Sequence, residues 1–402
     1  MPDVAIVGGG VIGASCALEL ARRGASVSLF ERDHLAAHAS GRNQGLWVLP
    51  DDDANVPMAR ASLEEYRRVA ADAPLDVGLD ADPVGTVLTA MNAREVRAAE
   101  EAVARATRHG FAVDDISNPR DIRDHEPGLT RNVAGAWLVH AGHRLDPGAL
   151  TVALALAAAE RGAEIHHHVH VRGLATSADT VRGVVTDDGV VDADMTIVAA
   201  GPWSSALLEP AGVHLPIVGA RGWLVRVAPT QKRLLTHLVE APAPHSALRD
   251  GSALRWPTGA EVIGEGEPGS DIGALLHPHR DGRTIVIGST RQIWLTPEPA
   301  EESIVGRLLD AAIELVPAIA EADVQSAWWG LRPLSPDDRP FVGAVREGLH
   351  VATGHGSEGV ILGSGTAQLV AAQIAGEEPP FDAAPFSPLR FEASERRTGE
   401  RD

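Results

Sequence analysis

Residues 4–13 read VAIVGGGVIG, and this stretch decides the first part of the fold. The apolar run at 4–7 is typical of a buried strand, and apolar residues over 11–23 recur at helical spacing. Gly24 ends that helix, and residues 25–30 form a second apolar strand. The sequence therefore predicts a β-α-β unit whose strands are parallel and whose crossover is right-handed.

Each glycine of this stretch has a physical role. Gly8 allows the tight turn from strand to helix, Gly10 lets a pyrophosphate approach the backbone, and Gly13 lets helix and strand pack closely. The free N–H groups and the dipole at the helix N-terminus favour phosphates. Glu31 ends the second strand and can accept hydrogen bonds from a ribose. The pattern predicts a dinucleotide site; it leaves FAD and NAD open, although its N-terminal position favours FAD.

The composition excludes several classes of protein. The 402 residues allow two or three domains, and the net charge of −20 argues against a nucleic-acid partner or a broad anionic-membrane face. Hydrophobic residues make up 44% of the chain, which excludes general disorder. A single cysteine, Cys16, excludes an intrachain disulfide and a cysteine-based zinc site, and it fits a reducing compartment.

No apolar stretch is long enough to suggest a membrane span. The longest, Ala149–Ala159, falls well short of the roughly 18 residues that a spanning helix needs and is typical of a core helix. The sequence enters its first strand pattern directly after Met1, with no basic leader segment. We therefore expect a cytoplasmic protein, and a homo-oligomer stays open.

The pattern is α/β at both ends of the chain and β-rich from 217 to 296. This predicts an α/β fold (α+β overall) in which a discontinuous Rossmann-like domain is interrupted by a β-sheet-rich domain. Further strands are expected at 83–90, 164–171, 181–186, 190–193, 195–199, 223–227, 260–263, 284–287 and 349–352, with 181–186 and 190–193 forming a hairpin. Further helices are expected at 93–109, 148–161, 301–315 and 359–374.

Six further motifs follow in order along the chain. They are 39–45 (ASGRNQG), 144–147 (RLDP), 198–203 (VAAGPW), 330–333 (GLRP), 338–340 (DRP) and 354–359 (GHGSEG). With the first motif, they resemble the D-amino-acid oxidase (DAO) superfamily of FAD-dependent oxidoreductases, which includes glycine oxidase and the sarcosine oxidases. The similarity extends from about Val4 to Gly376.

The resemblance implies FAD extended across the nucleotide domain, with a sheet of the second domain over the flavin and the substrate between them. The FAD-binding domain is expected at 1–80, 143–216 and 321–380, the substrate-binding domain at 81–142 and 217–320, and a polar tail at 381–402.

The motifs and the resemblance together predict the site residues. The residues expected to bind FAD are Gly8, Gly10, Val11, Ile12, Gly13, Glu31, Arg32, Ser40, Arg42, Asn43, Gly45, Val169, Gly201, Trp203, Gly356, Ser357, Glu358, Gly359 and Val360. The residues expected at the reacting centre are Arg332, Gln44 and His355. No metal ligand is expected. Arg221, Trp223, Arg249, Arg255 and Trp256 fall in the β-rich insertion that should line the active site.

Arg332 resembles the residue that grips the substrate carboxylate in amino-acid oxidases. A guanidinium is always charged and matches a carboxylate with two parallel hydrogen bonds. The resemblance implies hydride transfer from the α-carbon of a small amino acid or N-substituted amino acid to flavin N5, followed by hydrolysis of the imine to a keto acid. The site would supply orientation and carboxylate binding.

The turn at 354–359 repeats the physics of the first motif, because a helix N-terminus follows its glycines. That N-terminus is expected to face the pyrimidine edge of the flavin, where reduction places negative charge. Glu358 departs from glycine oxidase, where an arginine lies nearby. A carboxylate there would repel an anionic substrate or engage an ammonium group.

Two other functions stay open. One is oxidation of a 2-hydroxy acid, and the other is a flavin subunit of a larger amine or opine dehydrogenase complex. The electron acceptor is O2 or an unidentified carrier. The sole lysine, Lys232, lies in a polar loop, so an oxygen-activating lysine is not expected, and the sole tyrosine, Tyr66, lies in a helix well before the β-rich insertion.

Two groups of histidines invite other interpretations. His166, His168 and His170 would share one face of a strand, although we expect an exposed strand rather than a metal site there. His38 loosely resembles a histidine that carries covalent FAD in dimethylglycine dehydrogenases; we expect non-covalent FAD instead.

Overall fold

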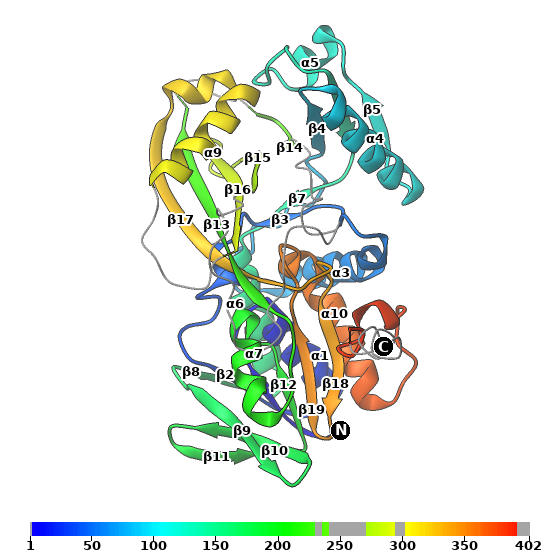
Figure 1. Cartoon of the computed structure of the whole chain (residues 1–402), viewed down its shortest axis with the longest axis vertical. Helices are drawn as coiled ribbons and strands as arrows, with labels where there is room; N and C mark the ends of the chain where they lie inside the picture. Colours follow the sequence, from blue (N-terminus) through cyan, green and yellow to red (C-terminus); the bar gives the residue numbers. More distant parts are fainter. Residues whose placement is uncertain (1, 230–234, 241–270, 294–301, 392–402) are drawn as a thin grey trace, which may run out of the picture.

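Two sheets dominate the structure, a computed structural model that describes residues 2–229, 235–240, 271–293 and 302–391. A six-stranded sheet has the order β18-β19-β12-β1-β2-β8, and an eight-stranded sheet has the order β17-β13-β16-β15-β14-β4-β6-β5. The first occupies the lower half of Figure 1 and the second the upper half. The mixed α/β class predicted from the sequence is confirmed.

The six-stranded sheet collects strands from distant parts of the chain. β1 pairs in parallel with β2 and with β12, and β12 pairs in parallel with β19, so the predicted β-α-β unit lies at the centre of the sheet. The edge strand β18 is antiparallel to β19. The strands are β1 (Asp3–Val7), β2 (Ser26–Glu31), β8 (Glu164–His167), β12 (Met195–Val198), β18 (Phe341–Arg346) and β19 (Leu349–Thr353).

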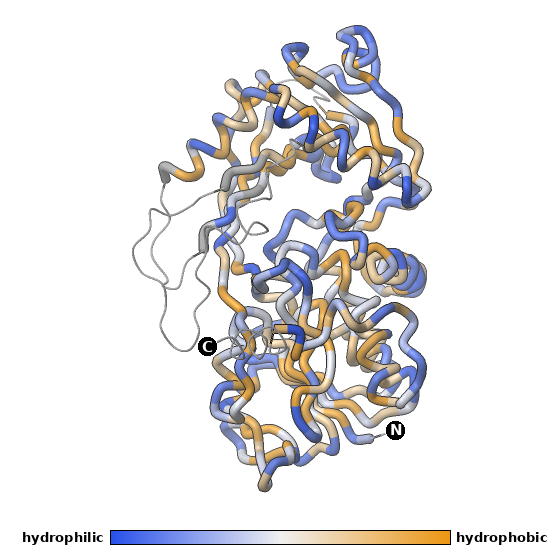
Figure 2. The backbone as a smooth tube through the Cα atoms, turned by 45° about the vertical axis from the view of Figure 1, so that its right-hand side comes forward, coloured by the Kyte–Doolittle hydropathy of each residue, from blue (hydrophilic) through white to orange (hydrophobic). Residues whose placement is uncertain are grey.

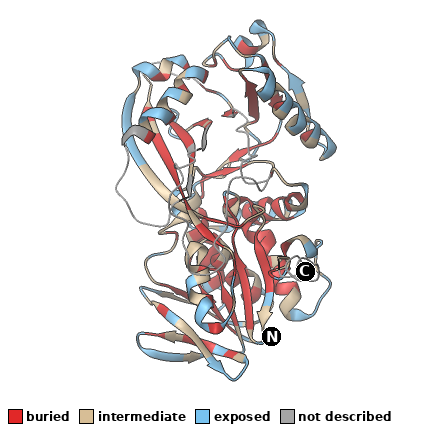
Figure 3. Ribbon diagram, viewed as in Figure 1, coloured by how far each residue is buried: buried red, intermediate tan, exposed pale blue. Residues whose placement is uncertain are grey.

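Four helices pack around this sheet and one another. They are α1 (Val11–Arg22), α3 (Val56–Asp72), α6 (Pro147–Ala159) and α10 (Gly359–Ala375), and their apolar residues form the largest core cluster with the sheet. Figure 3 shows α1, α10 and the central strands as the most continuously buried part of the molecule. Tyr66 of α3 is fully buried and donates a hydrogen bond to the carbonyl of Val360 in the first turn of α10 (2.8 Å). The sole phenol is therefore a structural group in the core.

The eight-stranded sheet is covered by α9 (Glu302–Leu315), whose apolar side chains join a second core cluster. Its longest strands, β13 (Val218–Ala228) and β17 (Asp323–Leu334), pair antiparallel and run toward the six-stranded sheet (Figure 1). Its other strands are β4 (Thr86–Ala90), β5 (Val113–Asp115), β6 (Gly135–Val139), β14 (Leu238–Glu240), β15 (Asp271–Pro278) and β16 (Ile285–Ile293), and α4 (Ala93–Arg108) and α5 (Pro119–His125) lie beside β4 to β6.

Smaller elements complete the fold. The predicted hairpin is present as β10 (Thr180–Thr186) and β11 (Gly189–Asp192), with β9 (Val171–Ser177) as a third strand. β3 (Leu46–Trp47) pairs with β7 (His143–Arg144). The short helices are α2 (Ala39–Arg42) and α7 (Ser204–Leu208), and the 3-10 turns are η1 (Asp53–Asn55), η2 (Gly201–Trp203), η3 (Glu209–Ala211), η4 (Pro317–Glu321) and η5 (Ala384–Phe386).

The helix caps show how local sequence sets the boundaries. The Asn92 side chain accepts from the backbone N–H groups of Arg94 and Glu95 at the start of α4, and Asp146 accepts from Ala149 N at the start of α6. Along the helices beside the eight-stranded sheet, hydrophobic residues are interspersed with hydrophilic ones, as expected for elements that bury one face (Figure 2). α1 and α10 have no such side-chain cap from their own N-cap residues, Gly10 and Glu358.

Several expectations differ from the structure. β17 pairs with β13 along its length and so belongs to the eight-stranded sheet, while the assignment of 321–380 to the FAD-binding domain stays a prediction. The strand expected at 164–171 is wrong beyond His167, because His168 has a φ of +57° and ends β8, so His166, His168 and His170 do not share one strand face. The exact domain boundaries stay a prediction.

Some predicted features lie outside the described residues. They are the strand at 260–263, Lys232, Arg249, Arg255 and Trp256. Across the part of the chain that the structure covers, no helix is both long and apolar enough to cross a membrane.

Replacement by alanine is expected to change stability in opposite directions at two helical glycines, one at the crossing of α3 and α10 and one on the exposed face of α9. A Cβ on Gly365 would lie 2.2 Å from the carbonyl oxygen of Met58, so Gly365→Ala must separate the helices and should lower the free energy of unfolding by about 1–3 kcal/mol. Gly306 in α9 is exposed with no atom near its Cβ position, so Gly306→Ala should raise stability by up to about 1 kcal/mol. The urea midpoints of unfolding of both variants measure these changes in stability. Equal shifts of the two midpoints would contradict the close crossing of α3 and α10.

Candidate active site

A cavity of about 360 Å³ opens at the carboxyl edge of the six-stranded sheet. Its walls come from the segments that follow β1, β2, β8, β12 and β19, and from the end of β17. In open α/β sheets the carboxyl edge is where ligands bind, because loops and helix N-termini meet there. The cavity therefore has the position that the first motif requires.

The β1–α1 turn leaves backbone open to this cavity. Gly8 has a φ of +114°, which only glycine adopts readily, and a Cβ on Gly13 would lie 1.9 Å from the carbonyl oxygen of Gly8. A Cβ on Gly10 would lie 2.9 Å from the hydroxyl of Ser40, which accepts a hydrogen bond from Val11 N (2.9 Å). Helix α1 can therefore approach an anion with its backbone N–H groups, and Ser40 lies beside the same point.

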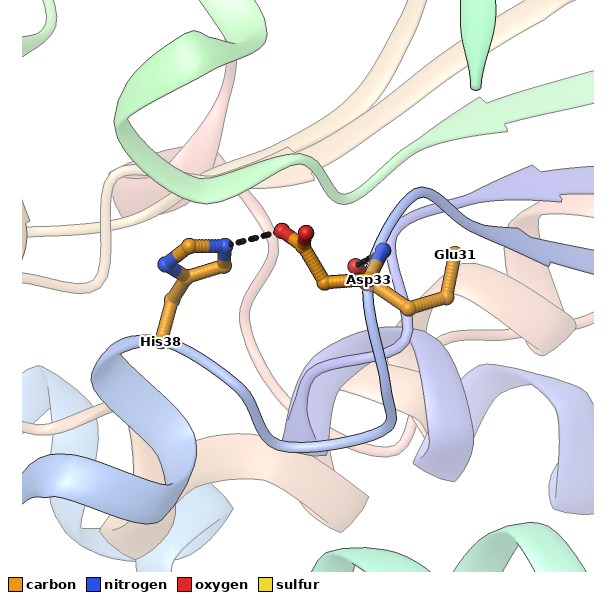
Figure 4. A group of neighbouring side chains, drawn as sticks. All are labelled: Glu31, Asp33 and His38. Atoms are coloured by element: carbon orange, nitrogen blue, oxygen red, sulfur yellow. Dashed lines mark hydrogen bonds and ion pairs between the residues drawn. The ribbon is translucent and has the colours of Figure 1, made fainter. Parts of the chain in front are cut away.

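Charged and aromatic side chains gather at one end of the cavity, where β2 ends. The buried carboxylate of Glu31 accepts from Gly9 N (2.7 Å) and from Asp33 N (2.8 Å). The guanidinium of Arg32 lies 3.9 Å from the ring centre of Trp203. Asp33 accepts from, or pairs with, His38 Nε2 (2.7 Å), and Figure 4 shows this pair beside Glu31.

Arg332 lies at another part of the cavity wall, on β17. Its guanidinium packs on Gly222 of β13, where a Cβ would lie 1.9 Å from Nη1, and Nη1 donates to the carbonyl of Thr290 (2.8 Å). Removal from water, followed by the charge of Arg291, lowers the pKa of Arg332 to about 10, so the group is still a cation at neutral pH. Among the described residues, no carboxylate lies within ion-pairing distance of it.

Arg291 of β16 is a second guanidinium near this wall, and no motif in the sequence pointed to it. It donates to Asp338 Oδ2 (3.2 Å) and approaches the hydroxyl of Ser357 (3.4 Å). Asp338 holds this position with a φ of +56°, a conformation that non-glycine residues rarely adopt, and its Oδ1 is buried without a partner among the described atoms. The Arg291–Asp338 ion pair carries no net charge. Among the described residues of this wall, Arg332 is therefore the cation without a carboxylate partner.

The glycine-rich turn before α10 forms the adjoining wall. Gly356, Ser357, Gly359 and Val360 line the cavity, and Gly356 has a φ of +55°. His355 also borders it, but burial lowers the pKa of His355 to about 3, and its Nε2 is engaged with Thr366 Oγ1 (3.0 Å). His355 is therefore a neutral packing residue rather than an acid or base.

Most predicted site residues line the cavity. They are Gly8, Gly10, Val11, Ile12, Glu31, Arg32, Ser40, Asn43, Val169, Gly201, Trp203, Arg332, His355, Gly356, Ser357, Gly359 and Val360. Asn43 also shapes the 39–45 segment, since its side chain donates to the carbonyls of Ala39 and Ser40 and accepts from Gly45 N.

Five predicted residues are not among the lining residues, each for a local reason. Gly13 and Gly45 are packed against backbone, at Gly8 and Leu145. Arg42 turns outward and donates to the carbonyls of Ala37 and Trp329. Gln44 crosses to the eight-stranded sheet and donates to Leu275 O (2.9 Å).

The fifth residue, Glu358, turns away from the cavity. Its carboxylate accepts from Asn55 Nδ2 (2.7 Å) and from Asp51 N (3.3 Å). The expectation that Glu358 meets the substrate is therefore not supported by the direction of its side chain.

One acidic group in the described part of the chain has the spacing of metal ligands. Glu31, Asp33 and His38 place one ligand atom each within 4.8 Å of the others (Figure 4). Arg32 already donates to Asp33 (3.2 Å), and the group lies at the nucleotide end of the cavity. Its chemistry suits a ribose as well as a cation, so it carries no metal assignment.

The residues present fit FAD. The backbone at Gly10 lines the cavity beside the hydroxyl of Ser40, a carboxylate lies at the end of β2, and the N-terminus of α10, which has no side-chain cap, belongs to another wall of the same cavity. A family model described as DAO, FAD dependent oxidoreductase, matches residues 3–373. The chain belongs to this family. Its expected cofactor, FAD, and its expected class, an FAD-dependent oxidoreductase, are both borne out.

Relatives of known activity agree with this assignment. Glycine oxidase of Pseudomonas aeruginosa is 29% identical over 96% of this chain and 98% of that protein. The 4-methylaminobutanoate oxidase (formaldehyde-forming) of Paenarthrobacter nicotinovorans is 28% identical over 96% of this chain and 45% of that protein. The chain spans about half the length of the bifunctional relatives that it also matches.

A solved structure shows the same fold at similar length. The crystal structure of glycine oxidase from Geobacillus kaustophilus superposes with a TM-score of 0.81 and 26% identity, and the match covers 97% of this chain and 98% of that one. The similarity therefore includes the second domain as well as the nucleotide-binding part.

The contact between Gly13 and Gly8 predicts that cofactor binding depends on a missing methyl group. Gly13→Ala should displace the N-terminus of α1 and raise the Kd for FAD at least about tenfold, a loss of about 1.4 kcal/mol in binding free energy, so the purified protein should retain less FAD. Gly173→Ala is the control, because no atom lies within 4 Å of its Cβ position and it is outside the cavity. Visible absorbance per mole of protein measures both; full FAD occupancy in Gly13→Ala would contradict the assignment.

Proposed function

We propose that this enzyme oxidises the C–N bond of a small amino acid or N-substituted amino acid. The observation that carries the proposal is Arg332: a half-buried cation on the cavity wall, cradled by Gly222 and largely removed from water, with no carboxylate partner among the described residues. A buried charge without a counter-ion is costly, so the site is suited to a ligand that brings a carboxylate.

The role of this chain's own residues is to bind the substrate and to orient it. Arg332 has one guanidinium N–H engaged with Thr290 O, which leaves others for a carboxylate and fixes the plane in which it can lie. When bound, FAD supplies the acceptor for the hydride from the substrate's α-carbon. The wall at Gly356–Val360 directs backbone N–H groups and a helix dipole at the adjoining space, which favours negative charge there.

No described side chain of the cavity stands out as a general base. His355 is neutral and committed to Thr366, and Tyr66 is buried in the core, where burial raises the pKa of its hydroxyl. The substrate amine can lose its proton to solvent, since oxidation of the neutral amine needs orientation more than proton abstraction. This fits an enzyme that accelerates the reaction by orienting its substrate.

We also propose that FAD is held without a covalent bond. His38 lies at the nucleotide end, paired with Asp33 and 4.6 Å from the ring of Trp203, while Arg332 and the turn before α10 mark the other wall. Unfolding in acid should therefore release all of the flavin into the supernatant; colour that stays with the chain would contradict this.

A cytoplasmic location, a homo-oligomer and the choice between O2 and a separate carrier as electron acceptor stay predictions. Reoxidation of the reduced enzyme in air distinguishes the two acceptors, and light scattering measures the oligomer.

The reaction class is tested with matched substrates. Glycine, sarcosine and both alanine enantiomers are mixed anaerobically with the enzyme, beside glycolate and both lactate enantiomers. The amines should bleach the flavin and the hydroxy acids should not. Bleaching by the hydroxy acids alone would replace the proposal by 2-hydroxy-acid oxidation.

Arg332→Lys tests carboxylate recognition in the same assay. Loss of a bidentate charged contact should raise the KM for the best amine substrate about 100-fold, equivalent to about 2.7 kcal/mol. Arg120→Lys, on the exposed face of α5, is the control and should leave KM unchanged. An unchanged KM in Arg332→Lys would remove the carboxylate assignment.

A further inference from the structure

Glu358 lies between the cofactor cavity and a group of hydrogen-bonded polar residues at Asp51–Asn55. It is the N-cap residue of α10, and its neighbours Ser357 and Gly359 both line the cavity. Its own carboxylate points the other way, into the segment before α3, where Asn55 Nδ2 (2.7 Å) and Asp51 N (3.3 Å) donate to it. The backbone at 358 therefore belongs to the cavity wall, whereas its charge lies directly behind that wall.

The groups that face Glu358 favour its neutral form. Asp51 and Asp338 are the nearest carboxylates, and each has its own cation, Arg105 (2.9 Å) and Arg291 (3.2 Å). No cation within the described ranges pairs with Glu358 itself. Burial, followed by the charge of Asp51, raises the pKa of Glu358 to about 7, against the lowering effect of the Asn55 hydrogen bond.

The remaining ionic groups of these segments are paired with one another. Asp52 accepts from Arg339 (2.7 Å), Asp53 pairs with Arg108 and His109, and Asp337 accepts from Arg390 (2.8 Å). Unlike these carboxylates, Glu358 has no cation partner among the described residues.

Asn55 is suited to both protonation states of Glu358. As placed, its Nδ2 donates to the carboxylate, and its Oδ1 is buried with no partner among the described atoms. Rotating the amide by half a turn would present Oδ1 as the acceptor for a protonated Glu358. The amide can thus donate to the ionised carboxylate and accept from the O–H of the neutral carboxyl group.

The first turn of α10 is held firmly, so the charge at 358 keeps a fixed place behind the cavity wall. Tyr66 donates to Val360 O (2.8 Å), and the hydroxyl of Ser62 accepts from Gly365 N (2.8 Å). Both partners belong to α3, which begins directly after Asn55.

We propose that Glu358 takes up a proton when the bound FAD is reduced, and so offsets the negative charge that the cofactor gains. This rests on the family's cofactor and not on the substrate class. In the balance, a hydride leaves the α-carbon for the cofactor, one proton leaves the substrate ammonium for solvent, and one proton from solvent forms the O–H bond of Glu358. No further oxidant or reductant is needed.

The sign of the effect follows from charge. Added negative charge on the other side of the wall raises the pKa of a neighbouring carboxyl group, so Glu358 binds its proton more tightly in the reduced enzyme. Between its pKa values in the oxidised and reduced enzyme, reduction therefore consumes one proton more than the cofactor alone consumes.

The test is the midpoint potential of the holoenzyme against pH, from about pH 6 to about pH 9, measured with a reporter dye and without substrate. In the wild type, the slope should steepen about twofold in a window that begins near the pKa of Glu358, because a two-electron couple then takes up two protons instead of one. Glu358→Gln should show the shallower slope throughout that window.

Two further variants keep the result interpretable. Glu377→Gln, at the other end of α10 and paired with Arg23, should retain the wild-type curve. Asn55→Ala removes the hydrogen bond that favours ionised Glu358, so its steep window should begin at higher pH. Visible spectra confirm that each variant holds FAD.

A wild-type curve in Glu358→Gln would overturn the proposal, whatever Asn55→Ala shows. Failure of the amine assay would leave these curves intact, since no substrate enters the measurement, so the two proposals fail separately.

Discussion

The close contact of Gly13 with Gly8 is the constraint on which the rest of the site depends. Only without a Cβ at 13 can α1 begin so near the end of β1, since that atom would lie 1.9 Å from the carbonyl oxygen of Gly8. The contact brings the N-terminus of α1 to the carboxyl edge of the sheet, where Ser40 and Glu31 converge on the same loop. We therefore propose that a pyrophosphate is bound here by backbone N–H groups rather than by cations, of which a chain of net charge −20 has few to spare.

The second sheet completes the site by bringing one unneutralised cation to the first. β13 and β17 reach from the eight-stranded sheet to the cavity, and Gly222 on β13 makes room for the guanidinium of Arg332 on β17. The wall formed by the turn before α10 adds a helix N-terminus, and Glu358 adds a carboxyl group that titrates behind it. Binding of a carboxylate and control of charge beside the cofactor thus come from different segments of one cavity wall.

Short sequence motifs predicted the elements whose structure depends mainly on neighbouring residues. The β-α-β unit, the hairpin at Thr180–Asp192 and the glycine-rich turn before α10 follow from strand and helix periodicity and from glycine placement, and the lining at Arg332 followed from the family resemblance. Sequence alone could not give the direction of a side chain that bonds across about 300 residues, as Glu358 does with Asn55, nor the approach of Arg291 to Ser357. Those contacts depend on how two sheets meet, which no short spacing encodes.

The central claim is that one cavity binds FAD by the N-terminus of α1 and a substrate carboxylate by Arg332. A crystal structure of the enzyme with FAD and a non-reacting carboxylate such as acetate tests it most directly. We expect the pyrophosphate within hydrogen-bond distance of the backbone at Gly10 and of the Ser40 hydroxyl, and the carboxylate on the guanidinium of Arg332, beside the flavin. A carboxylate bound elsewhere in the active site, with Arg332 engaged only with protein, would contradict it.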